Sequence, residues 1–346
     1  MRALQLHAIG DLRLDELPAP TPGPGEVLVR VAAVGVCRTD IEVHSGGHPD
    51  YRTGLAMTPV TPGHEWAGTV VGVGADVEGF APGDEVTGET NIGCGHCAYC
   101  HSGHGNVCPH RVETGILNRH GAMRELHPHP AAYTHHLQGV PLDEGALVEP
   151  AAVATWACEQ AEITPKDRVA VIGAGSIGNL AMQAARAFGA RFVMITSRSP
   201  EKLELAQRLG ADAAVNAARE DVPARAAELT DGKLFDVVIE ASGHIAGLTD
   251  AFRLARTRAR IMPLSVYEST DFGINPTVIV STELRVIGSC GSPNVWPAII
   301  GLIRRGRIQV APLISARYPL SQFREAYEAV ERGSPTLLKA LLKPQE

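Results

Sequence analysis

The clearest hydrophobic pattern of the chain lies near its centre. A short apolar run, residues 169–172, leads directly into the glycine-rich segment Gly173-x-Gly175-x-x-Gly178. Apolar residues then recur at helical spacing, at Ile177, Leu180, Ala181, Ala184, Ala185 and Phe188. The pattern predicts a strand, a tight turn and an amphipathic helix, which is the context in which a glycine-rich loop binds a dinucleotide.

Each glycine of this loop has a physical role in such a site. Gly173 permits the turn, Gly175 lets the backbone approach a pyrophosphate, and Gly178 lets the helix pack close to the strand. Ser176 and Ile177 open the helix, where free N–H groups and the positive end of the helix dipole attract phosphate. The alternative is a glycine-rich turn in an ordinary parallel sheet, but the strand–turn–helix order favours the dinucleotide site.

The rest of the pattern predicts an α/β protein with two kinds of domain. Residues 166–290 alternate apolar runs with helical stretches, which indicates a doubly wound parallel sheet. The expected strands are 169–172, 192–196, 213–216, 236–240, 260–264 and 284–288. Residues 1–36 have β-type alternation with Pro/Gly punctuation, while 296–305 and 321–332 look helical and 337–342 could form a closing strand.

Length and charge exclude several classes of protein. A chain of 346 residues is too long for one ordinary core, so two domains are expected. The net charge of −7 offers no basic surface for nucleic acid. No apolar run approaches the ~18 residues of a membrane span. The first ten residues lack a signal-peptide pattern, so we expect a cytoplasmic protein.

The strongest local signal is a cluster of four of the seven cysteines, Cys94-x2-Cys97-x2-Cys100-x7-Cys108. Four thiolates so close in sequence can close a tetrahedral site, which suits a structural zinc ion. Two disulfides or an iron–sulfur cluster are the alternatives. The absence of an export signal favours the metal over disulfides.

Two groups of histidines and two further cysteines show no metal-ligand spacing. We expect the histidines near the cluster, His96, His101, His104 and His110, to be solvated loop residues. A second group, His127, His129, His135 and His136, is expected at the surface. Cys158 and Cys290 belong to no motif and are expected to be buried thiols.

A second candidate metal site is spread along the first half of the chain. Cys37 and His64 each lie at the end of an expected strand, and a β fold could bring them together around a borderline-soft cation. A buried thiol and a hydrogen-bonded core histidine are the alternatives. Glu149 immediately precedes a helical stretch, where a carboxylate usually caps the helix or faces its dipole.

Four features in this order resemble the zinc-dependent medium-chain dehydrogenases: Cys37-Arg38-Thr39-Asp40, Gly63-His64-Glu65, the four-cysteine lobe and the Gly173 loop. Val148-Glu149-Pro150 is similar to the sorbitol, polyol and threonine dehydrogenase branch. The resemblance covers nearly the whole chain. It implies a GroES-like catalytic domain (1–150, structural zinc lobe 90–110), a Rossmann domain (151–292) and a return to the catalytic domain (293–346). It also implies an active site in the cleft between the domains, and homodimers or homotetramers.

The resemblance implies roles for individual residues. Cys37 and His64 match catalytic zinc ligands, and Glu65 and Glu149 are the two candidate carboxylates, of which either can bind the metal. Asp40 matches a residue that orients the ligating histidine. The family's chemistry is Lewis-acid activation of a substrate hydroxyl by zinc, followed by hydride transfer to a nicotinamide. Thr39 matches the hydroxyl that begins a proton relay.

Two residues beside this motif depart from many relatives. Glu42 stands where many have a histidine that passes the proton to solvent. Glu42 itself, the nearby His44 or a water chain could replace that histidine, and we hypothesise that Glu42 carries the proton. Arg38 stands where many polyol dehydrogenases have glycine; it resembles the pyrophosphate-binding arginine of other alcohol dehydrogenases, or is a surface residue.

The end of the second Rossmann strand bears on the choice of cofactor. NAD-binding relatives usually carry an acidic residue there for the ribose diol, whereas this chain has Ser197 followed by Arg198. Without a carboxylate there is no repulsion against a 2′-phosphate, and Arg198 can pair with that phosphate. The sequence therefore predicts NADP in preference to NAD. Family likeness also places Ser242, with Gly243, near the cofactor.

The resemblance implies oxidation of a secondary hydroxyl of a polyol, sugar or cyclitol to a ketone, or the reverse reaction. Within that class, residues 37–150 also resemble aminocyclitol dehydrogenases of the scyllo-inosamine type. A threonine-type amino-alcohol dehydrogenase and a non-catalytic NADPH-binding or structural relative are the alternatives. Intact Cys37, His64 and Glu149 argue against the last of these. Candidate pocket residues besides Glu42 and His44 are Glu113 and Trp296.

Overall fold

The computed structural model describes residues 1–267 and 273–346, and the chain forms two compact units. Unit 1 comprises Met1–Glu149, Gly291–Arg304 and Val310–Glu346, and unit 2 comprises Pro150–Cys290 and Arg305–Gln309. The C-terminal segment thus returns to the unit in which the chain begins. None of the helices described is long and apolar enough to cross a membrane.

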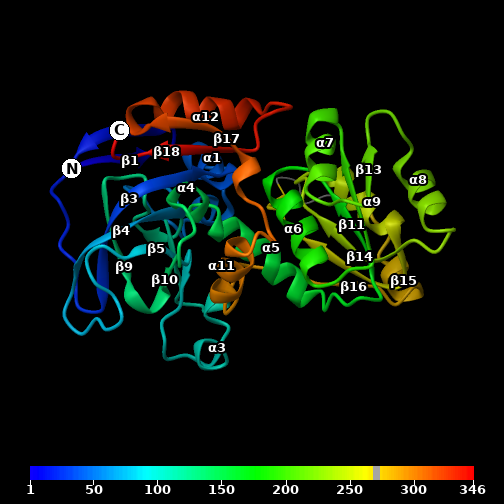
Figure 1. Ribbon diagram of the computed structural model, residues 1–346, viewed down its shortest axis with the longest axis horizontal. Coiled ribbons are helices and arrows are strands. Elements are labelled where there is room, and N and C mark those ends of the chain that lie inside the picture. The colour runs from blue at the N-terminus through cyan, green and yellow to red at the C-terminus, as the bar shows by residue number, and fades with distance from the viewer. Residues whose placement is uncertain (268–272) are drawn as a thin grey trace. The chain divides into compact units, whose positions relative to one another are not determined.

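Unit 2 is built on a six-stranded parallel sheet in the order β13-β12-β11-β14-β15-β16 (Figure 1). Its strands are β11 (Arg168–Ile172), β12 (Phe192–Ser197), β13 (Ala213–Asn216), β14 (Phe235–Glu240), β15 (Ala255–Pro263) and β16 (Arg285–Val286). Counted from the first strand the order is 3-2-1-4-5-6, the arrangement of doubly wound dinucleotide-binding folds. This confirms the predicted fold class, although β15 begins at Ala255 rather than at 260.

The helices of unit 2 follow the expected alternation with strands. They are α5 (Val148–Gln160, which begins in unit 1), α6 (Ser176–Ala187), α7 (Pro200–Arg208), α8 (Val222–Leu229), α9 (Ile245–Leu254) and α10 (Thr277–Ser281). Helix α7 begins where its sequence indicates, because the Ser199 hydroxyl accepts a hydrogen bond from Lys202 N (3.2 Å) and Pro200 fits the first turn.

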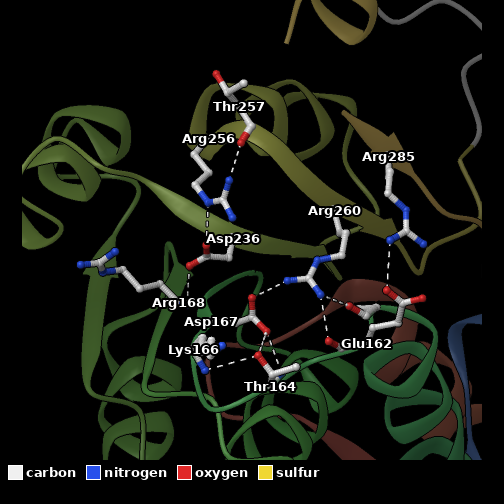
Figure 2. A network of polar contacts seen from close by, with 11 residues as sticks. Glu162, Thr164, Lys166, Asp167, Arg168, Asp236, Arg256, Thr257, Arg260 and Arg285 are labelled. Atoms are coloured by element: carbon white, nitrogen blue, oxygen red, sulfur yellow. Dashed lines mark hydrogen bonds and ion pairs between the residues drawn. The ribbon is translucent and has the colours of Figure 1, made fainter. Parts of the chain in front are cut away.

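A charged network fixes the amino ends of the strands in unit 2 (Figure 2). Asp236, on β14, accepts hydrogen bonds from Arg168 N (2.7 Å) and Arg256 Nε (2.6 Å). Arg260, on β15, pairs with Asp167 just before β11. Because ligands of such sheets bind beyond the carboxyl ends of the strands, this network is at the edge opposite to the Gly173 loop and has a structural role.

Unit 1 contains a seven-stranded sheet in the order β10-β5-β4-β3-β18-β17, with β9 also paired to β3. These strands are β3 (Glu26–Val36), β4 (Glu65–Val73), β5 (Glu85–Gly88), β9 (Leu126–Pro130), β10 (Thr134–His136), β17 (Ile314–Pro319) and β18 (Lys339–Lys343). A two-stranded sheet has β1 (Arg2–Ala8) and β2 (Asp11–Glu16), and a three-stranded sheet has β6 (Asn91–Ile92), β7 (Val112–Thr114) and β8 (Asn118–Arg119). Strand β18 runs antiparallel to β3, so the end of the chain lies beside the strand that leads to Cys37.

Unit 1 also contains short helices. They are α1 (Arg38–Ser45), α2 (Pro49–Arg52), α3 (Ala98–His101), α4 (Leu142–Gly145), α11 (Trp296–Arg304) and α12 (Phe323–Arg332). Of these, α4 and α12 pack on strands of the larger sheet. In Figure 1, α12 runs along β17 and β18, where Phe323 and Tyr327 join the hydrophobic core. Helices α11 and α12 and strand β18 agree with the predicted C-terminal elements, whereas α1 was not predicted.

Two of the histidines expected at the surface are instead fully buried. His127 and His129 lie on β9 directly opposite Val29 and Val27 of β3, so both point to the apolar face of the sheet. Their rings meet Trp66 edge-on, at centroid distances of 5.2 and 5.1 Å. The expectation was wrong because local composition does not show which face of a strand is covered.

This burial predicts an acid-sensitive fold. Burial lowers the pKa of His127 and of His129 well below the usual 6.5, with further lowering by Arg124 and Arg119 respectively. The unfolded chain therefore binds more protons than the folded one below about pH 6.5, and the free energy of unfolding falls by up to about 1.4 kcal/mol per pH unit for each histidine. We expect wild-type stability in urea to fall between pH 7 and 5.5.

The variant His127→Val/His129→Val removes both titrating rings and is expected to flatten that pH dependence. His136→Val, at an exposed position of the same unit, is the control and should keep the wild-type slope. An equal slope in the double variant and the wild type would show that other groups cause the acid sensitivity.

Candidate metal and cofactor sites

The four clustered cysteines converge on one point between β6 and β7. Sγ of Cys97 lies 3.6 Å from those of Cys100 and Cys108, and the Cys94 and Cys100 sulfurs are 4.0 Å apart. A tetrahedral zinc ion with Zn–S bonds of about 2.3 Å requires sulfurs about 3.8 Å apart. The arrangement fits one tetrahedral ion, and no two of these cysteines form a disulfide.

Backbone groups support the thiolate form in this lobe. Cys108 Sγ accepts hydrogen bonds from Cys94 N (3.5 Å) and His110 N (3.3 Å), and the first of these is the main cause that lowers the pKa of Cys108 to about 6. A Cβ at Gly93 would lie 2.7 Å from Cys100 Sγ, so glycine is required there. His96, His101, His104 and His110 are exposed, as expected.

A second cluster joins Cys37, His64 and Glu65. Each offers one ligand atom, and these atoms lie within 4.8 Å of one another. Cys37 follows β3 and caps α1, while His64 and Glu65 lie at the start of β4, the strand antiparallel to β3. His64 and Glu65 are buried. A thiolate, an imidazole and a carboxylate form a donor set that suits a catalytic zinc ion, which leaves a position open for water or substrate.

Asp40 ties the two halves of this cluster together. Its carboxylate accepts hydrogen bonds from Cys37 N (2.8 Å) and Gly63 N (3.1 Å), and its Oδ1 lies 3.8 Å from His64 Nδ1. Gly63 has a φ of 96°, and a Cβ there would lie 2.6 Å from Met123 Cγ. The loop before His64 therefore follows a path that only glycine permits, and Asp40 fixes it to helix α1.

The two carboxylates have different surroundings. Lys339 Nζ lies 2.6 Å from both carboxylate oxygens of Glu65, and both side chains are buried. Glu149 Oε1 accepts a hydrogen bond from the Thr90 hydroxyl (2.9 Å), and burial raises the pKa of Glu149 to about 7. Glu149 is outside the cluster of ligand atoms formed by Cys37, His64 and Glu65. The sequence analysis did not identify Lys339 or Thr90. The one sequence feature that points to Lys339 is its place as a lysine in an otherwise apolar closing strand.

The predicted relay residues lie on α1. Thr39 Oγ1 is 3.7 Å from Cys37 Sγ, and the partly buried Glu42 follows one turn later. The His44 ring packs edge-on against buried Tyr327, at a centroid distance of 5.9 Å. Arg38 Nη1 lies 3.5 Å from Glu331 O. The structure thus brings Thr39 to the metal cluster, whereas His44 packs against α12.

The candidate pocket residues are held by neighbours within unit 1. Glu113 is buried and accepts hydrogen bonds from Asn91 Nδ2 (3.0 Å) and Arg111 Nε (2.7 Å). The buried Trp296 stacks on His135, with ring centroids 5.3 Å apart. Both residues therefore have packing or hydrogen-bonding roles, whether or not they contact substrate.

The glycine-rich loop of unit 2 has the expected form. A Cβ at Gly178 would lie 1.7 Å from Gly173 O, and one at Gly173 would lie 2.9 Å from Ser242 N. The loops after β11 and β14 are therefore adjacent, at the point where the strand order reverses. A Cβ at Gly175 would meet no described atom within 4 Å, which leaves the loop's backbone approachable by a ligand.

The other cofactor residues predicted in unit 2 lie at the same ends of the strands. Ser197 ends β12 and accepts a hydrogen bond from Ser199 N (3.2 Å), and Arg198 is exposed. The Ser242 hydroxyl donates to Glu240 Oε1, so in this structure it stabilises its own loop.

The two cysteines outside the motifs differ in burial. Cys158 is buried, but Cys290 is exposed, because it lies in irregular chain beyond β16 rather than in a core element.

Parts of both units match models of known protein families. Residues 23–139 match the model of the alcohol dehydrogenase GroES-like domain, and residues 176–305 match that of zinc-binding dehydrogenases. The chain is 33% identical to a sorbitol dehydrogenase of Halalkalibacterium halodurans over 98% of this chain and 97% of that protein. The chain belongs to the zinc-dependent medium-chain dehydrogenases.

Further relatives of this dehydrogenase fall in the polyol branch of the superfamily. It is 32% identical to an erythritol/L-threitol dehydrogenase of Mycolicibacterium smegmatis, over 99% of this chain and 97% of that one. A zinc-binding dehydrogenase structure from Sinorhizobium meliloti, bound to NADP, superposes with a TM-score of 0.92 at 32% identity and covers 99% of both chains. The dehydrogenase is therefore an oxidoreductase that acts on CH–OH donors and uses zinc and a nicotinamide cofactor.

Proposed function

We propose that this dehydrogenase interconverts a secondary hydroxyl of a polyol, sugar or cyclitol and the corresponding ketone. The observation that carries the proposal is the buried cluster of Cys37, His64 and Glu65 in a chain that also has an approachable Gly173 loop. The relatives named above act on sorbitol, erythritol and L-threitol, which supports the substrate class.

We assign the catalytic metal to Cys37, His64 and Glu65, and the structural metal to Cys94, Cys97, Cys100 and Cys108. When bound at the first site, zinc supplies Lewis acidity that lowers the pKa of a hydroxyl. Lys339 balances the charge of Glu65, and Glu149, held by Thr90, is a second carboxylate of the same unit. Asp40 orients His64 through its position near Nδ1.

The chain's own residues would move the proton and hold the cofactor. The Thr39 hydroxyl is positioned to accept the substrate proton beside Cys37, and Glu42 is the next carrier along α1. The backbone of Gly173, Gly175 and Gly178, with the first N–H groups of α6, would bind the pyrophosphate. We further propose that NADP is preferred, because Ser197 replaces an acidic residue and Arg198 is an exposed cation beside it.

A panel of substrates and cofactors tests this function. We expect activity with sorbitol, xylitol, erythritol or myo-inositol, and a higher kcat/KM with NADP than with NAD. Arg198→Gln should lower kcat/KM about tenfold with NADP and leave it unchanged with NAD, because it removes a charged hydrogen bond to the 2′-phosphate. Arg208→Gln, at an exposed position of α7, is the matched control.

Each other outcome would refute a defined part of the proposal. A strong preference of the wild type for NAD would refute the cofactor assignment. Activity with L-threonine alone would indicate an amino-alcohol dehydrogenase. NADPH binding without turnover of any substrate would indicate a binding protein.

A further inference from the structure

Unit 1 contains a buried guanidinium without a carboxylate partner. Arg124 is 7% exposed, and among the described residues its only side-chain hydrogen bond runs from Nη2 to His127 Nδ1 (2.9 Å). Its Nε has no hydrogen-bond partner there. Burial lowers the pKa of Arg124 to about 10, so the group still carries its proton at neutral pH. His127 is neutral, because burial lowers its pKa, and it offers no compensating charge.

The acidic side chains around Arg124 are already paired with other groups. Glu26 binds Arg119 Nη2 (2.8 Å) through one oxygen and Gly23 N (3.1 Å) through the other. Asp15 contacts His7 Nε2 at 2.6 Å, and Glu125 binds Arg2 Nε at 2.7 Å. Glu26 acts electrostatically on Arg124 as well as on Arg119, so one carboxylate faces two guanidinium groups. One positive charge is therefore in excess among these described groups, and a buried charge without a partner destabilises a fold.

Arg124 lines two neighbouring cavities at once. One has a volume of about 590 Å³ and the other about 330 Å³, and Pro59, His120 and Arg124 belong to the walls of both. His120 Nδ1 accepts a hydrogen bond from Thr61 N (3.0 Å), so its neutral ring carries a proton on Nε2 and can donate. Arg119 adds a second guanidinium to the larger cavity, and its Nε also has no described partner.

We propose that Arg124, with Arg119 and His120, binds a small oxyanion, the phosphate or carboxylate group of a metabolite or the free ion. The anion would balance the excess positive charge of this cluster, which Glu26 in the wall of the larger cavity offsets only in part. It would accept hydrogen bonds from the terminal guanidinium N–H groups and from His120 Nε2. Planar guanidinium groups suit both kinds of oxyanion, because they donate in pairs. The larger cavity also has apolar walls from Met57 and Pro128, against which the organic part of a metabolite can lie. None of the proposed metal ligands or glycine-loop residues lines it.

The test is calorimetric titration of the full-length protein, saturated with NADP, with inorganic phosphate and separately with acetate at constant ionic strength. We expect saturable binding of at least one anion to the wild type, and at least tenfold weaker binding by Arg124→Met. The preferred anion identifies the phosphate or carboxylate class. Arg225→Met, which removes a partly exposed arginine paired with Glu228 in unit 2, should bind as the wild type does.

Several results would overturn the proposal. The first is the absence of anion binding by the NADP-saturated wild type, and the second is equal binding by Arg124→Met. The third is a heat of phosphate binding that the apo protein shows and that disappears once NADP is bound, which would place phosphate in the cofactor site. If Arg124→Met does not fold, Arg119→Gln serves instead, because it keeps Arg124 but removes a donor from the cavity. Unchanged affinity in that variant would contradict the assigned donor set.

Discussion

Replacing Cys37 by serine is expected to lower kcat/KM by about 10³-fold or more and to remove about one zinc ion per chain. Serine is a weaker ligand than thiolate for a borderline-soft cation. Loss of the Lewis acid forfeits several kcal/mol of stabilisation of the developing charge, and each tenfold in rate corresponds to about 1.4 kcal/mol. Metal content by mass spectrometry and steady-state kinetics measure the two effects.

The matched control for that experiment is Cys290→Ser. Cys290 is exposed and outside both metal clusters, so both zinc content and kcat/KM should stay at wild-type values. If Cys37→Ser retains two zinc ions and full activity, the assignment of Cys37 as a ligand is wrong. If it loses activity but retains both ions, Cys37 has a different role in the reaction.

Replacing Cys97 by serine should remove the other zinc ion and lower the Tm by about 10 °C or more. The lobe from 94 to 110 exposes most of its side chains, so it has little apolar core of its own. The free energy of metal binding to such a lobe contributes directly to its free energy of folding. A loss of several kcal/mol lowers the Tm of a domain of this size by about 10 °C. Circular dichroism melting with metal analysis provides the measurement.

The lobe offers its own control. His101 is exposed and lies within the same segment, so His101→Ala should keep both the zinc ion and the Tm. A Cys97→Ser protein with unchanged metal content and melting behaviour would show that the cysteines do not hold a structural ion. A similar loss in His101→Ala would mean that the lobe is sensitive to any substitution.

Features that depend on local order could be predicted from the amino-acid sequence. The apolar run before Gly173 and the helical spacing after it specify strand, turn and helix within twenty residues, and the structure has β11 and α6 at those positions. The four cysteines are also close in sequence, so their convergence requires only a short loop and one helical turn. Signals of this kind do not depend on how distant segments pack.

Features that join distant segments of the chain depend on the three-dimensional fold. Lys339 pairs with Glu65 across 274 positions of sequence, because β18 closes the sheet beside β3 and β3 pairs with β4. His127 and His129 are buried because the pairing of β9 with β3 turns their face of β9 toward the core. Local composition does not show which face of a strand is covered. The excess positive charge of Arg119 and Arg124 over Glu26 likewise becomes visible only in the three-dimensional arrangement. Charge balance and burial are properties of three-dimensional neighbours, so a sequence pattern can suggest the ligands of a site but not the groups that surround them.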